Sequence, residues 1–292
     1  MTARFPAPRA RFVWRMGDQE VELGGGVWVV GILNCTPDSF SDGGVHLDAS
    51  AVVGRLEQMI HEGADMIDVG GESTRPGALP VPAEEEWRRV APVFRAARAD
   101  GLRIPLSIDT RKSEVAARAC ELGAAVINDI SALRHDPAMA ETARSLGAGL
   151  VLMHMQGEPA TMQAEPHYDD VVREVSDFLS GRLLAARAAG IELERIVVDP
   201  GIGFGKSAEH NWALLRGIPE LAEACARPVY IGASRKRFLG AATGLPVHDR
   251  VEASIAVHVA AALAGAHLVR VHDVAATVRA MRVADDLRAG DR

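Results

Sequence analysis

The stretch Met66-Ile-Asp-Val-Gly-Gly-Glu-Ser-Thr-Arg-Pro-Gly77 shows the unit from which most of this chain is built. A short, mostly apolar run ends at two glycines, a polar loop follows, and a helical pattern then covers Glu84–Ala99. Runs that are hydrophobic throughout, instead of alternating, are typical of parallel strands buried on both faces. The stretch therefore predicts one strand, loop and helix of a parallel α/β protein.

The same unit recurs along nearly the whole chain. Apolar runs bounded by turn residues predict eight strands, at Val27–Leu33, Met66–Gly70, Ile104–Asp109, Ala125–Ile130, Leu150–Met155, Ile196–Asp199, Val229–Gly232 and Leu268–Val271. Periodic segments predict helices between them, among others at Ser50–Glu62, Glu84–Ala99, Glu114–Leu122, Tyr168–Ala189 and Val251–Ala264. Strands that alternate with helices in this way indicate repeated βα units.

Eight βα units in about 250 residues fit a (β/α)8 TIM barrel in length and in number. A doubly wound open sheet is the main alternative, and periodicity alone does not exclude it. The barrel is favoured because no linker interrupts the repeats and because polar residues follow almost every strand. We expect a single domain over residues 1–292 with the barrel at 26–284, and an N-terminal β-hairpin, from Arg11–Trp14 and Glu20–Leu23, that closes the barrel bottom.

Composition narrows the class of protein further. The 292 residues are 48% hydrophobic and 24% charged, as in soluble globular chains. A net charge of −7 argues against a nucleic-acid partner held by phosphate contacts. Three cysteines cannot build a disulfide framework, which fits a reducing cytoplasm, and the apolar runs are too short to span a membrane. We expect a cytoplasmic protein without nucleic-acid or membrane partners.

The strand ends carry the candidate chemistry. In a barrel the carboxyl ends of all strands meet at one mouth, where active sites of this fold lie. Two carboxylates, an amide and an ammonium, from Asp109, Asn128, Asp199 and Lys236, match a flat heterocycle with N–H donors and a carbonyl acceptor. The alternative is an ion-pair network that serves only the barrel core. It is possible for each group alone but strained for all four.

Three further patterns in the sequence bear on ligand binding. Arg270 and His272 lie two residues apart, so they share one side of the last strand and form a candidate anion site. Gly201–Lys206 has neither the spacing of a nucleotide-binding loop nor that of a dinucleotide fingerprint, and a glycine-rich turn explains most of it. The histidines and cysteines lack the spacing of zinc ligands, which argues against a tightly bound zinc.

Five segments together resemble the pterin-binding signatures of the dihydropteroate synthase family. They are Asn34–Gly44, Gly70–Gly77, Asp199–Lys206, Ser234–Lys236 and Arg270–Asp273, in that order, and the resemblance covers nearly the whole chain. It implies a (β/α)8 barrel and the condensation of 6-hydroxymethyl-7,8-dihydropterin pyrophosphate with p-aminobenzoate in folate biosynthesis. The products are 7,8-dihydropteroate and pyrophosphate, and the expected cofactor is Mg²⁺.

The resemblance also implies roles for individual residues. Pterin-binding residues would be Asp109, Asn128, Met153, Asp199, Lys236 and Arg270. Pyrophosphate-binding residues would be Asn34, Thr74, Arg270 and His272, with Asn34 also the protein ligand of Mg²⁺. The p-aminobenzoate pocket would contain Phe40, Thr74, Arg75, Pro76, Phe204, Ser234 and Lys236. Catalytic residues would be Arg270 and His272, which face the departing anion, and Asp42, which faces the nascent cation.

One departure and two alternatives accompany this interpretation. Arg237 stands where some members have serine, which puts the affinity for p-aminobenzoate and for sulfonamides that mimic it in question. A methyltransferase domain that binds methyl-tetrahydrofolate would share the pterin contacts but would not need the Arg270–His272 pair. A non-catalytic pterin-binding paralogue is the second alternative. The apolar stretch Ala253–Ala264 predicts a homodimer, as in the family.

Overall fold

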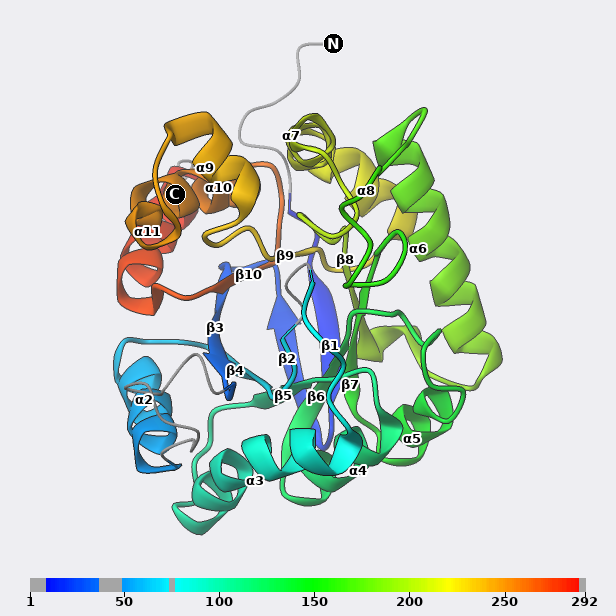
Figure 1. Cartoon of the computed structure of the whole chain (residues 1–292), viewed down its shortest axis with the longest axis vertical. Coiled ribbons are helices and arrows are strands. Elements are labelled where there is room, and N and C mark those ends of the chain that lie inside the picture. Colours follow the sequence, from blue (N-terminus) through cyan, green and yellow to red (C-terminus); the bar gives the residue numbers. More distant parts are fainter. Residues whose placement is uncertain (1–8, 37–48, 74–76, 289–292) are drawn as a thin grey trace.

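The computed structural model describes residues 9–36, 49–73 and 77–288, and within them it contains an eight-stranded parallel sheet (Figure 1). The strand order is β8-β7-β6-β5-β4-β3-β10-β9. The strands are β3 (Trp28–Asn34), β4 (Met66–Gly70), β5 (Leu106–Asp109), β6 (Ala124–Asp129), β7 (Gly149–Met153), β8 (Ile196–Asp199), β9 (Tyr230–Ile231) and β10 (Leu268–Val271).

The two edges of this sheet meet and close it into a barrel. A parallel bridge joins Val198 of β8 to Val229, directly before β9, and the backbone N–H of Val198 donates to the Pro228 carbonyl at 2.9 Å. The prediction of a (β/α)8 TIM barrel is therefore confirmed. Three strands have the predicted bounds, whereas β9 is only two residues long, half of the predicted Val229–Gly232.

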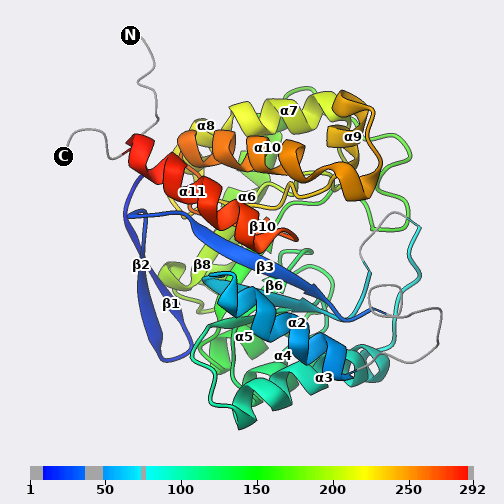
Figure 2. The ribbon, with the colours of Figure 1, turned by 90° about the vertical axis from the view of Figure 1, so that its left-hand side faces the viewer.

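Helices surround the strands on the outside of the barrel (Figures 1 and 2). The α-helices are α2 (Ala49–His61), α3 (Ala83–Ala99), α4 (Ser113–Glu121), α5 (Met139–Ser145), α6 (Val171–Ala188), α7 (Ala208–Arg216), α8 (Ile218–Cys225), α9 (Arg237–Thr243), α10 (Val251–Leu263) and α11 (Val274–Arg288). Two 3-10 turns are η1 (Leu193–Arg195) and η2 (Val247–Asp249). No helix within the described ranges is both long and apolar enough to cross a membrane.

The predicted N-terminal hairpin is present and lies across one end of the barrel (Figure 2). Strands β1 (Phe12–Met16) and β2 (Gln19–Leu23) pair in antiparallel fashion. Trp14 is fully buried in one apolar cluster with inward-facing barrel residues such as Val126 and Val197. The Trp14 indole N–H donates to the carbonyl of Arg195, just before β8, at 3.0 Å. The hairpin therefore seals the amino-terminal end of the barrel, as predicted.

Alternation along the strands explains why the opposite end is polar. On β4, Ile67 and Val69 pack outward against the helix-covered core, so Met66 and Asp68 face the barrel interior. On three other strands an apolar residue is likewise followed, two positions later and nearer the carboxyl end, by a polar one. The pairs are Val126 and Asn128, Val197 and Asp199, and Leu268 and Arg270. The barrel interior is thus apolar near the hairpin and charged near the carboxyl ends of the strands.

Candidate active site

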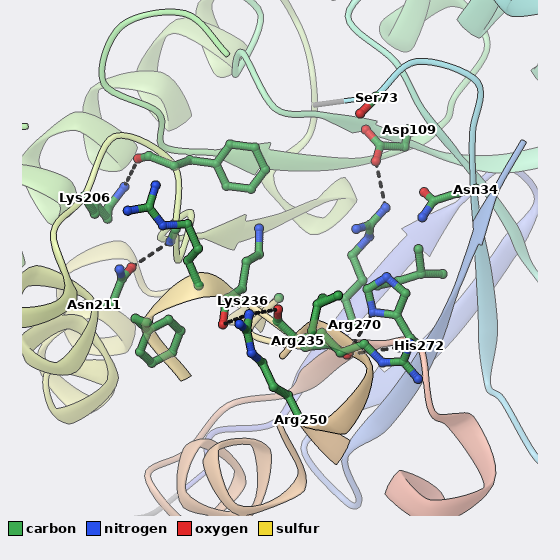
Figure 3. A pocket seen from close by; sticks show the side chains of 18 of the residues that line it. Asn34, Ser73, Asp109, Lys206, Asn211, Arg235, Lys236, Arg250, Arg270 and His272 are labelled. Carbon is green, nitrogen blue, oxygen red and sulfur yellow. Dashed lines mark hydrogen bonds and ion pairs between the residues drawn. The ribbon is translucent and has the colours of Figure 1, made fainter. Parts of the chain in front are cut away.

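A cavity of about 1200 Å³ opens at the carboxyl ends of the strands (Figure 3). It gathers predicted site residues from five regions, namely the ends of β3, β5 and β10 and the loops after β8 and β9. The predicted residues that line it are Asn34, Asp109, Phe204, Ser234, Lys236, Arg270 and His272. Asn128, Met153 and Asp199 are buried beside this group, at the ends of β6, β7 and β8. The structure therefore brings the described part of the predicted pterin site together.

Arg270 lies at the centre of the floor of the cavity and is paired with two carboxylates. Its Nε donates to Oδ2 of Asp68 at 2.6 Å, and a terminal nitrogen donates to Oδ2 of Asp109 at 2.7 Å (Figure 3 shows the second contact). Asn128 also donates to Oδ2 of Asp68, at 2.9 Å. Burial by itself lowers the pKa of Arg270, but the two carboxylates outweigh burial and raise it, so the guanidinium stays charged.

Two of the predicted pterin-binding residues are carboxylic acids whose pKa values are raised above the ordinary range. Burial raises the pKa of Asp109 to about 7, with further upward contributions from Asp68 and Glu86 that Arg270 and Lys236 oppose. Burial also raises the pKa of Asp199 to about 6, against a hydrogen bond of 2.7 Å from the backbone N–H of Gly201. Both groups therefore change charge near neutral pH and respond strongly to a ligand that donates hydrogen bonds.

Lys236 stands over an aromatic ring at the side of the cavity. Its Nζ lies 4.1 Å from the ring centroid of Phe204, a cation–π contact. Burial and then the charge of Arg270 lower the pKa of Lys236 to about 8, while Asp199 and Asp109 oppose that shift. At neutral pH most Lys236 side chains are therefore charged and can donate hydrogen bonds, and the ammonium group contacts the ring of Phe204.

His272 enters the cavity as a neutral imidazole. Burial, followed by the charges of Arg270 and Arg235, lowers its pKa to about 3. Its Nδ1 lies 2.9 Å from Oγ of Ser234, and that oxygen already accepts the backbone N–H of His272 at 3.2 Å. The hydroxyl can therefore donate to Nδ1, which favours the tautomer with the proton on Nε2. The sequence paired His272 with Arg270 as an anion site; in this structure His272 offers a hydrogen bond and not a charge.

Asn34 presents an amide at the end of β3, half-buried in the lining of the cavity. The described residues contain no cluster of three or more His, Cys, Asp or Glu that could hold a metal ion. One amide oxygen is too weak a donor set for a resident transition metal. It is compatible with a magnesium ion that takes most of its ligands from phosphate oxygens and water.

Two lysines hold together the segments around the cavity, of which Lys206 is buried and Lys112 is half-buried. Lys206, fully enclosed after β8, contacts Nδ1 of His154 and the carbonyl of Phe204, each at 2.9 Å. Lys112 bonds Glu72 and Glu86, and so attaches the first residues after β4 to helix α3. Of the three lysines in the chain, only Lys236 was predicted from the sequence to contact a ligand.

Some predicted residues cannot be placed, and one important residue was missed. Phe40, Asp42, Thr74, Arg75 and Pro76 lie outside the described residues, so the roles expected of them stay predictions. Sequence reasoning overlooked Asp68, because it sits in the middle of a strand instead of at its end. The available signal was a lone acidic residue inside the run Met66–Gly70, where burial demands a partner.

The fold and this cavity define the class of protein, and comparison with known proteins agrees. Residues 30–272 match the family model described as pterin binding enzyme. The chain therefore belongs to the pterin binding enzyme family.

Within that family the similar proteins are dihydropteroate synthases. The one from Neisseria meningitidis serogroup B is 47% identical over 279 residues, which cover 94% of this chain and 97% of the relative. A structure of the Xanthomonas albilineans enzyme with 4-aminobenzoic acid has a TM-score of 0.88 at 47% identity and covers 96% of this chain and 99% of its own. The Burkholderia cenocepacia enzyme complexed with 7,8-dihydropteroate has a TM-score of 0.86 at 46% identity, with 96% and 97% covered.

Proposed function

We propose that this chain is an enzyme of folate biosynthesis that joins 6-hydroxymethyl-7,8-dihydropterin pyrophosphate to p-aminobenzoate, giving 7,8-dihydropteroate and pyrophosphate. The observation that carries the proposal is the convergence of Asp109, Lys236 and Arg270 at one cavity of about 1200 Å³, with Asp199 buried beside them. The similar structures that contain 4-aminobenzoic acid or 7,8-dihydropteroate support this choice of substrates.

The pterin would bind on the floor of the cavity. Its amino and ring N–H groups match the carboxylates of Asp109 and Asp199, which can accept hydrogen bonds when they are ionised. Its ring carbonyl matches the Nζ donor of Lys236. Because the pKa values of these carboxyls are raised to about 7 and about 6, a ligand that donates N–H groups would draw them into the charged form. Met153 and Phe204 belong to one buried apolar cluster that would pack against the ring.

The pyrophosphate tail would lie near Arg270, His272 and Asn34. The guanidinium supplies the positive charge, and Nε2–H of the neutral His272 supplies a hydrogen bond. A magnesium ion bound by the amide oxygen of Asn34 and by phosphate oxygens would neutralise part of the negative charge of the leaving group. Placing these groups around the anion stabilises the charge that develops as pyrophosphate departs.

The reaction itself needs little acid–base chemistry from the protein. The bond between the pterin methylene carbon and the pyrophosphate oxygen breaks, and its electron pair leaves with the oxygen. The amine nitrogen of p-aminobenzoate forms the new C–N bond with its lone pair and then releases one proton to water. The protein's task is to hold the two reactants in line and to exclude water. Asp42, expected to face the nascent cation, remains a sequence-based proposal.

The aryl amine would occupy the outer part of the cavity. Phe204 and Ser234 line it, and Arg237 adds an exposed guanidinium for which the structure shows no partner among the described residues. The carboxylate of p-aminobenzoate would therefore meet positive charge at this end. The predicted contacts with Phe40, Thr74, Arg75 and Pro76 belong to the same part of the proposal.

A pyrophosphate-release assay with both substrates tests the function. We expect release that requires both substrates, and formation of dihydropteroate in equal amount. Lys236→Ala should raise the KM for the pterin substrate by about 100-fold, because it removes a charged donor from the pocket. Arg173→Ala, a change of an exposed cation on α6, is the matched control and should leave the KM unchanged. Pterin binding without any release of pyrophosphate would contradict the proposal and favour a non-catalytic pterin-binding protein.

Two further proposals concern the setting of the enzyme. We propose a homodimer, on the basis of the apolar stretch Ala253–Ala264, most of which forms α10, and a cytoplasmic location, on the basis of cysteine usage. All three cysteines are free thiols in the structure, and burial raises the pKa of Cys35 to about 12, so this thiol is unreactive. Light scattering that gives the mass of a single chain would contradict the dimer.

A further inference from the structure

The two carboxylates that hold Arg270 differ in their access to a ligand. Asp109 lines the cavity, whereas Asp68 is fully buried and does not line it. Each carboxylate accepts one hydrogen bond from the Arg270 guanidinium. Asp109 accepts from a terminal nitrogen at 2.7 Å, and Asp68 accepts from Nε at 2.6 Å. A ligand can therefore compete with Arg270 for Asp109 and cannot reach Asp68.

Asp68 also holds a second polar side chain in place, that of Asn128. Its Oδ2 accepts from Nε of Arg270 and from the amide nitrogen of Asn128, so one oxygen orients both side chains. Its other oxygen, Oδ1, is buried and has no hydrogen-bond partner among the described residues. The strands involved are not neighbours, since β3 separates β4 from β10 and β5 separates β4 from β6. Asp68 thus connects three strands across the barrel interior.

Ligand binding would change the hydrogen-bond partners of Arg270. In the structure, Asp68 and Asp109 together balance its charge. When a pterin takes the carboxylate of Asp109, as the proposed function requires, Arg270 loses that partner. A largely buried guanidinium without a partner is unstable, so Arg270 would shift unless a second anion holds it. The bond between Nε and Asp68 remains available, because no ligand reaches it.

We propose that Asp68 is a positioning residue of the active site. It anchors Arg270 at Nε, so that the outer edge of the guanidinium can exchange Asp109 for the anionic part of the substrate while Arg270 stays in place. This inference rests on the proposed function and assigns no contact between Asp68 and substrate. It predicts that loss of Asp68 damages the use of the pterin substrate more than that of p-aminobenzoate.

Steady-state kinetics of the full chain test this. Asp68→Ala should raise the KM for the pterin pyrophosphate about tenfold or more and lower kcat, while the KM for p-aminobenzoate changes less than about threefold. Asp68→Asn keeps the shape and one acceptor oxygen and should lie in between. Ser107→Ala is the matched control: Ser107 is paired with Asp68 in register on β5 and is equally buried, but its hydroxyl bonds no described residue. Its kinetics should stay within about twofold of those of the unmodified chain.

A mutant cycle separates positioning from general support of the barrel. In a background that carries both Arg270→Gln and Asn128→Ala, Asp68→Ala should add less than about threefold to the loss in kcat/KM, because both side chains that Asp68 orients are already changed. Losses that multiply would overturn the proposal. If Asp68→Ala does not fold, the same cycle with Asp68→Asn gives the answer.

The outcome is distinguishable from a failure of the proposed function. If the unmodified chain releases pyrophosphate and Asp68→Ala behaves like it, only the positioning role is refuted. If the unmodified chain releases no pyrophosphate with these substrates, the proposed function fails before Asp68 is tested.

Discussion

The ion pair between Lys112 and the buried Glu86 of helix α3 offers a direct test of the electrostatics of this barrel. Nζ of Lys112 bonds the carboxylates of Glu86, which is fully buried, and Glu72. Lys112→Met keeps most of the volume of the side chain but removes the charge. Glu86 then becomes a buried carboxylate without a cation among the described residues, whereas Glu72 keeps its ion pair with Arg111. We expect a large loss of stability from this single substitution.

The size of the expected loss of stability follows from the burial of Glu86. Removing one partner of a buried ion pair costs about 3 kcal/mol or more, because the remaining charge stays desolvated. For a chain of this size that loss lowers the melting temperature by about 6–12 °C. Adding Glu86→Gln should recover more than half of the loss, because it removes the stranded charge. Urea denaturation and thermal unfolding at pH 7 measure both effects.

A matched control lies on the same helix. Arg88 and Glu85 form a pair at 2.7 Å, but their side chains are 63% and 32% exposed. Arg88→Met should destabilise the chain much less than Lys112→Met does, since water screens exposed pairs. Equal losses for Lys112→Met and Arg88→Met would show that burial does not set the strength of these pairs.

The loss at Lys112 should depend on pH in a defined direction. Burial raises the pKa of Glu86 above its ordinary 4.5, and Lys112 opposes that rise. Without Lys112 the pKa rises further, so the folded state binds a proton that the unfolded state has released. The free energy of unfolding of Lys112→Met then falls as pH rises through this pKa, and the deficit grows from about pH 5 to about pH 8. A deficit that stays constant over this range would refute the reasoning.

Two further predictions concern the site. Protons compete with the pterin for Asp109, whose pKa is about 7, so the affinity for a pterin without pyrophosphate should fall up to about tenfold per pH unit below pH 7. Calorimetry from pH 8 to 5.5 measures this, and a flat profile would contradict it. Gly201→Ala should destabilise by about 3 kcal/mol or more, because φ is +68° and a Cβ would lie 1.9 Å from the carbonyl oxygen of His154. In Gly101→Ala, φ is +61° with nothing within 4 Å, so chemical denaturation should show a loss of only about 1 kcal/mol.

Much of the fold could be predicted because it depends on local patterns. Buried parallel strands need apolar residues on both faces, and this requirement marks runs such as Ile196–Asp199 and Leu268–Val271 at their observed bounds. The polar end of the barrel was also predictable, since all parallel strands point the same way. For β9, the sequence Val229–Gly232 looks like a full strand, but only Tyr230–Ile231 pairs as one.

The sequence by itself determined that this chain alternates strands and helices and that acidic, basic and amide groups gather at one end of the strands. Only the tertiary structure decided which of these groups are paired. Arg270 bonds Asp68 across an intervening strand, and burial keeps His272 neutral. The physical reason is that a strand pattern specifies which side a residue faces, whereas ion pairing and pKa depend on distances and burial that arise when the barrel closes.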